Sequence, residues 1–161
     1  DMVHIWQGGY YLMDKEKLEN RLRYSKLVIG NIEETRKTFF DKYKPAPIGC
    51  MLIDVDYYSS TVSVLNILEE SELYFLPRIQ MYFDDISPDY EFQGENLAIK
   101  EFNAEHDMMK ISPETMHYLD FREKTKVCHR YNHQLYNKKI HVYLGNKLSQ
   151  TDYELKLYDY I

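Results

Sequence analysis

The sequence predicts an α/β domain built as a doubly wound sheet with an antiparallel hairpin at its C-terminal edge. Apolar runs of strand length alternate with segments whose apolar residues recur at helical spacing, so that strand and helix follow one another three times. Residues 131–144 alternate loosely without an obvious crossover helix, which suits an antiparallel edge pair. The length of 161 residues fits one domain of this kind.

The first third of the chain predicts two helices with a strand between them. Asp14 is placed to cap a short helix, and residues 26–30 form a short apolar run that indicates a buried strand. Asn31, followed three residues later by Glu34, resembles a capping box. The helix that opens there is expected to bury three aromatic residues, Phe39, Phe40 and Tyr43.

Two further strands are expected to end in acidic residues. One buried apolar run leads into Asp54 and Asp56, and a second, which follows Pro77, leads into Asp84 and Asp85. A helical stripe of apolar residues separates the two runs. In open α/β sheets the carboxyl ends of the strands form the rim where ligands bind. The sequence therefore places four carboxylates at that rim.

A helix is expected to begin at Gly94 and to carry Ala98 and Phe102 on its apolar face, and residues 140–144 form the clearest late strand. The two cysteines are too few for a disulfide framework. Cys50 lies inside a predicted core strand, so we expect a reduced and buried thiol there.

Composition and charge exclude two function classes. A net charge of −6 argues against general nucleic-acid binding, which needs clustered lysine and arginine. Apolar runs fall short of a membrane span, and the first residues lack a signal-peptide pattern. The cytoplasm is therefore the expected compartment. The sequence is compatible with a homo-oligomer, but this pattern does not determine the oligomeric state.

The two acidic strand ends predict a Mg²⁺ site. Hard cations prefer carboxylate oxygens and keep further positions for water or substrate. Asp54 and Asp56 are two apart and lean to the same side, while neighbouring strand ends lie about 5 Å apart, within reach of Asp84 and Asp85. A carboxylate left free of the metal could take a proton from a substrate hydroxyl. The alternative is that each aspartate only caps the following helix, which is less favoured for two paired clusters together.

A metal-dependent nucleotide-sugar glycosyltransferase is a second interpretation of part of the pattern. An apolar strand that runs into Asp54 and Asp56 is also how many such enzymes present their metal site. The later pair, Asp84 and Asp85, favours the first interpretation.

Four segments together resemble the macrocin O-methyltransferase family: IDVDYYSST at residues 53–61, LPR at 76–78, FDD at 83–85 and GENLAIKEF at 94–102. The resemblance covers the chain from about Gly8 to His106. It implies a Rossmann-like fold and a Mg²⁺-assisted enzyme that uses S-adenosylmethionine. The acceptor would be a hydroxyl of a sugar or a natural-product-like small molecule.

The resemblance also implies roles for single residues. Asp54, Asp84 and Asp85 correspond to the Mg²⁺ ligands of that family, and Asp56 corresponds to the general base of some members. Asn31 follows the preceding predicted strand, at a turn that often lies near the adenine of the cofactor.

The chain departs from the family pattern in two places. The usual Gly-Gly before the Asp-Asp strand is replaced by residues 77–80, and no glycine-rich loop follows a first strand to hold the methyl donor. We therefore expect that the N-terminal strands of such a fold are missing and that the chain, which begins at Asp1, is part of a longer protein. The alternative is a non-catalytic domain that kept the fold and lost the cofactor.

Overall fold

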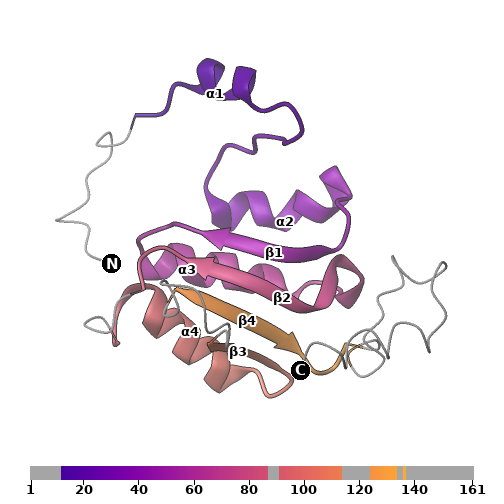
Figure 1. Ribbon diagram of the computed structural model, residues 1–161, viewed down its shortest axis with the longest axis vertical. Coiled ribbons are helices and arrows are strands. Elements are labelled where there is room, and N and C mark those ends of the chain that lie inside the picture. The colour runs from indigo at the N-terminus through magenta and orange to yellow at the C-terminus, as the bar shows by residue number, and fades with distance from the viewer. Residues whose placement is uncertain (1–11, 87–90, 114–123, 134–135, 137–161) are drawn as a thin grey trace, which may run out of the picture.

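The chain forms a mixed α/β domain with a four-stranded open sheet, seen in a computed structural model that describes residues 12–86, 91–113, 124–133 and 136 (Figure 1). The elements, in chain order, are α1 (Lys15–Arg21), α2 (Ile32–Tyr43), β1 (Ile48–Ile53), α3 (Tyr58–Leu65), the 3-10 turns η1 (Asn66–Glu69) and η2 (Glu72–Tyr74), β2 (Phe75–Phe83), α4 (Gly94–Glu105), β3 (Met109–Pro113) and β4 (Thr125–Arg130).

The strand order in the sheet is β1-β2-β4-β3. β1 and β2 are parallel, whereas β4 runs antiparallel to both β2 and β3. A parallel pair needs a crossover, and α3 with the two 3-10 turns supplies it. The antiparallel addition at one edge is thus present, and it is built from β3 and β4. The late strand expected at residues 140–144 lies outside the described residues.

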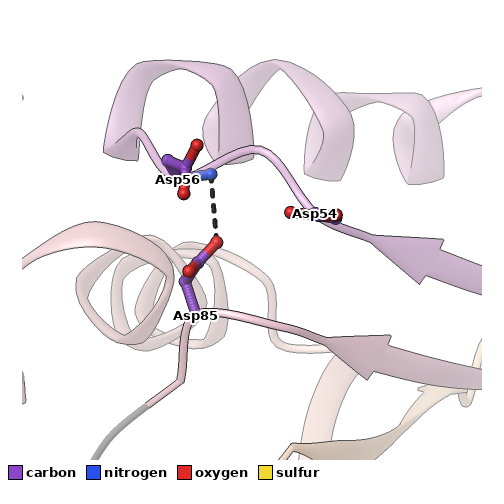
Figure 2. A group of neighbouring side chains, drawn as sticks. All are labelled: Asp54, Asp56 and Asp85. Atoms are coloured by element: carbon purple, nitrogen blue, oxygen red, sulfur yellow. Dashed lines mark hydrogen bonds between the residues drawn. The ribbon is translucent and has the colours of Figure 1, made fainter. Parts of the chain in front are cut away.

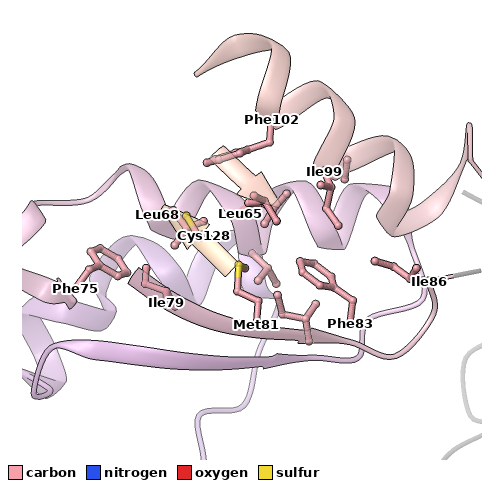
Figure 3. Close-up of a cluster of buried hydrophobic side chains, with 14 of the residues drawn as sticks. Leu65, Leu68, Phe75, Ile79, Met81, Phe83, Ile86, Ile99, Phe102 and Cys128 are labelled. Carbon is pink, nitrogen blue, oxygen red and sulfur yellow. The ribbon is translucent and has the colours of Figure 1, made fainter. Parts of the chain in front are cut away.

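The core lies between one face of the sheet and α2, α3 and α4. Phe75, Ile79, Met81 and Phe83 alternate along β2 and are buried, because successive strand residues point to opposite faces. Figure 3 shows these side chains meeting Leu65, Leu68, Ile99 and Phe102, which come from α3, η1 and α4. Phe40 of α2 joins the same cluster and contacts Phe75.

The other face of β1 and β2 is open among the described residues. Leu52 is 79% exposed, and Cys50 and Gln80 on the same face are exposed as well. The expectation of a buried Cys50 was therefore wrong, since an apolar run does not reveal whether both faces of its strand are covered. A second layer of helices on this face, as in a doubly wound sheet, is not found within the described ranges.

The helices predicted to start after Asp14 and Asn31 are confirmed. The Asn31 side chain accepts the Glu33 N–H at 2.9 Å and so caps α2. Of the three aromatic residues expected to be buried by α2, only Phe40 is buried; Phe39 and Tyr43 are half-buried.

The strand predicted at residues 26–30 was wrong. This segment has no strand pairing, and Ile29 is 52% exposed. Pro77 lies inside β2 rather than before it, next to the register shift between Ile48 and Cys50 of β1. Proline has no N–H for the ladder, so an irregular stretch accommodates it.

Candidate functional site

The parallel pairing of β1 and β2 brings their acidic ends together. Ile53 lies opposite Phe83 in the register, and the Asp84 N–H donates to the Ile53 carbonyl at 3.0 Å. The two strands therefore end at the same level, and the residues that follow them share one end of the sheet. We call this end, with Asp54, Asp56, Asp84 and Asp85, the acidic end.

Three of the four aspartates converge. Carboxylate oxygens of Asp54, Asp56 and Asp85 lie within 4.8 Å of one another, and the first two residues are exposed. Figure 2 shows Asp54 at the end of β1, Asp56 in the loop before α3 and Asp85 after β2. The chemistry of such a donor set is that of a hard divalent cation, which binds carboxylate oxygens.

The loop between β1 and α3 gives Asp56 its place. Asp56 has a backbone φ of +48°, which residues other than glycine rarely adopt. The Tyr57 N–H donates to the Val55 carbonyl and closes a tight turn around Asp56. The Asp56 N–H donates to Asp85 Oδ2 at 3.2 Å, so a hydrogen bond links the two strand ends (Figure 2).

Asp84 is held apart from this group by two other residues. The Tyr82 hydroxyl donates to Asp84 Oδ1 at 2.8 Å. Lys124 Nζ donates to the same oxygen at 3.2 Å and also to the Asp84 backbone carbonyl. These hydrogen bonds and the lysine charge lower the pKa of Asp84. In this structure Asp84 is thus already paired with a cation of the protein itself.

Asp85 and Glu95 have the opposite electrostatic surroundings. Burial and the nearby Asp56 charge raise the pKa of Asp85. Glu95, in the first turn of α4, is only 1% exposed and accepts the Asp85 N–H at 2.9 Å. Burial, together with the charges of neighbouring aspartates, raises the pKa of Glu95 to about 8. Carboxyl groups crowded in this way ionise reluctantly unless a cation joins them.

Sequence analysis missed Glu95 and Lys124 as parts of this end. A glutamate in the first turn of a helix is usually an exposed partner of the helix dipole, so its residue type gave no signal of burial. Lys124 lies 40 residues beyond Asp84, in a part of the chain where the apolar pattern is weak.

Asn31, the candidate cofactor residue, has a structural role, because its side chain caps α2. The glycine-rich turn between a strand and a helix that would cradle a methyl donor is not found in residues 12–86, 91–113, 124–133 and 136. The described residues therefore provide carboxylates that suit a cation, and they do not include a glycine-rich turn for S-adenosylmethionine. None of the described helices is both long and apolar enough to cross a bilayer.

Comparisons with known proteins return no match: no family model, no curated protein and no solved structure matches this chain. The resemblance to the macrocin O-methyltransferase family therefore stays a prediction from the residues quoted above.

Proposed function

We propose that this chain binds Mg²⁺ at the acidic end and serves the O-methylation of a small-molecule hydroxyl. One observation carries the proposal: three carboxylates from two neighbouring strand ends meet within 4.8 Å. Like charges at this separation repel, and a divalent cation between them replaces repulsion with attraction.

Asp54 and Asp85 are the proposed ligands, with Asp56 as the general base. Mg²⁺ usually binds one or two carboxylates and keeps its other positions for water and substrate oxygens. The Asp56 carboxylate would then be left to accept the proton of the acceptor hydroxyl. Bound Mg²⁺ supplies a positive charge that favours the ionised form of that hydroxyl.

The ligand set differs from the one that the family resemblance implies. The resemblance includes Asp84, whereas here Tyr82 and Lys124 hold the Asp84 carboxylate. We therefore propose that Asp84 supports the end of β2. The two assignments predict different Mg²⁺ affinities for Asp84→Asn.

The methyl-transfer class and the doubly wound fold come from the resemblance and are part of the same proposal. The open face of β1, with its exposed Leu52, is where a second helical layer of that fold would pack. The outer edge of β1 is where a further strand would pair. The methyl donor is assigned to none of the described residues, and no step is derived through it.

Mg²⁺ titration by calorimetry tests the ligand set. Asp54→Asn and Asp85→Asn are expected to weaken Mg²⁺ binding by about tenfold or more, because even changes outside the ligand shell cost about 10- to 100-fold. Asp84→Asn is the matched control, since it removes the neighbouring charge, and it should bind within about threefold of the parent. Unchanged affinity in Asp54→Asn and Asp85→Asn would reject the site. A tenfold loss of Mg²⁺ affinity in Asp84→Asn would instead indicate that Asp84 is a ligand, as the family resemblance implies.

A second experiment tests the reaction class. Titration of the full protein with S-adenosylhomocysteine is expected to release heat, and no binding at millimolar ligand would reject methyl transfer. A thermal shift with a nucleotide sugar, seen only when Mn²⁺ is present, would instead support the glycosyltransferase. Neither response from a protein that still binds Mg²⁺ would support a non-catalytic domain.

A further inference from the structure

Glu95 is the most deeply buried acidic side chain among the described residues. It is 1% exposed, and only one of its oxygens is engaged: Oε2 accepts the Asp85 N–H at 2.9 Å. The other oxygen, Oε1, is buried without a hydrogen-bond partner in the described part of the chain. Burial of a polar atom that lacks a partner is costly, so an ordinary helix start does not explain this carboxyl.

The hydrogen bonds around Glu95 form a chain that crosses the acidic end. Glu95 in α4 accepts from the backbone of Asp85, and the Asp85 carboxylate in turn accepts from the backbone of Asp56. Gly94, the residue before Glu95, lies next to the same loop: a methyl group at Gly94 would stand 3.7 Å from the Asp56 carbonyl oxygen. The first turn of α4 therefore holds the end of β2 by a hydrogen bond and lies next to the loop that follows β1.

We propose that Glu95 is a positioning residue of the cation site, which holds the Asp85 peptide so that the Asp85 carboxylate faces Asp54 and Asp56. The inference rests on the proposed function, because it takes Asp85 to be a ligand. It goes beyond that function by adding a buried residue from α4 that touches neither cation nor substrate. Residues that orient metal ligands in this way contribute to affinity without binding the metal.

Three variants of Glu95 separate positioning from charge. Glu95→Gln keeps an oxygen at the same reach and can accept the Asp85 N–H, so its cation affinity is expected within about threefold of the parent. Glu95→Ala removes the acceptor. Glu95→Asp keeps a carboxyl but shortens the side chain by one methylene, which draws it away from Asp85. Both should bind about 10- to 100-fold more weakly.

Mn²⁺ is the probe, with free and bound ion distinguished by electron paramagnetic resonance. Glu105→Ala, an exposed carboxylate at the other end of α4, is the matched control and should bind Mn²⁺ as the parent does. Thermal unfolding of each variant is measured in parallel. Should Glu95→Ala fail to fold, the pair Glu95→Gln and Glu95→Asp still decides the matter, because rescue by glutamine alone would not follow from a purely structural carboxyl.

Asp85→Asn, measured beside these variants, distinguishes the two possible failures. Parent-like Mn²⁺ binding in Glu95→Ala and Glu95→Asp, together with lost binding in Asp85→Asn, would overturn the positioning role and leave the cation site standing. Parent-like binding in Asp85→Asn would overturn the site and the positioning role with it.

Discussion

A deeply buried ionisable side chain lies at each end of the sheet, and the two have opposite surroundings. At the end away from the aspartates, Arg130 of β4 is 3% exposed. Its guanidinium donates to the Leu68 and Glu70 carbonyls and lies 4.6 Å from the centre of the Phe75 ring. At the acidic end, Glu95 is as deeply buried, yet its neighbours are carboxylates.

The difference indicates which end would be stabilised by a cation from outside the chain. The carbonyls of Leu68 and Glu70 lie at the end of η1, where a cation is favourable, and they accept hydrogen bonds from two of the three guanidinium nitrogens of Arg130. The third nitrogen, Nε, is buried without a hydrogen-bond partner in the described part of the chain. Lys124 is the basic residue seen to contact the acidic end, and it pairs with Asp84. Asp54, Asp56 and Asp85 are left as a compact group of like charges. We infer that the arginine end is structural and that the acidic end is a binding site.

The largest expected effect is at the arginine end. Arg130→Met should lower the free energy of unfolding by about 3 kcal/mol, because two carbonyls near the core lose their donors. Urea denaturation measures the loss. Arg130→Lys is the control: it keeps the charge but not the fork that reaches both carbonyls, and it should recover part of the stability. A loss below about 1 kcal/mol in Arg130→Met would remove the contrast between the two ends.

A smaller effect is expected from pH at the acidic end when EDTA keeps the protein free of divalent cations. The pKa of Glu95 rises from 4.5 to about 8 on folding, so the folded protein holds this proton more tightly than the unfolded chain. The stability that this contributes is present below pH 4.5 and is lost as the pH rises to about 8. With one pKa unit equal to about 1.4 kcal/mol, we expect a fall of about 2 kcal/mol, less than the full shift implies because ionised groups recruit water.

Urea denaturation across this pH range measures the effect. Glu95→Gln does not ionise and should give a flatter profile than the parent. An equally steep fall in that variant would place the titrating group elsewhere, and a flat profile in the parent would mean that the acidic end is compensated without a cation.

The meeting of the acidic strand ends was predictable because it follows from chain order. Two apolar runs separated by one helix form a parallel pair, and a parallel pair delivers both carboxyl ends to the same rim. The helix starts at Asn31 and Gly94 were predictable from local signals. The strand expected at residues 26–30 had the right composition, but a strand also needs a partner beside it, and the described residues provide none.

The different surroundings of Asp84 and Asp85 were not predictable. These neighbours look alike in the sequence, and only tertiary structure places Lys124 beside one and Glu95 beside the other. Likewise, nothing local distinguishes Glu95 from an exposed first-turn glutamate. The order of the apolar runs therefore predicted that the acidic residues would meet, whereas the distribution of charge among them needed the fold.

The smallest expected effect is that of Asp85→Asn on the opening of the sheet, and the two cysteines report it. Cys50 is exposed and should react at once with a chromogenic disulfide reagent, which provides the internal standard. Cys128 is buried and lies on β4, the strand between β2 and β3. Burial raises the pKa of its thiol to about 12, so Cys128 should react only when the sheet opens.

Arg130→Met should accelerate the labelling of Cys128 by about 100-fold, the factor that corresponds to about 3 kcal/mol. Asp85→Asn should leave the rate within about twofold of the parent, because the asparagine oxygen can still accept the Asp56 N–H that the Asp85 carboxylate accepts. If Asp85→Asn exposed Cys128 as fast as Arg130→Met does, both ends would belong to one cooperative structural unit. The acidic end would then be part of what holds the sheet together rather than a site kept apart for a ligand.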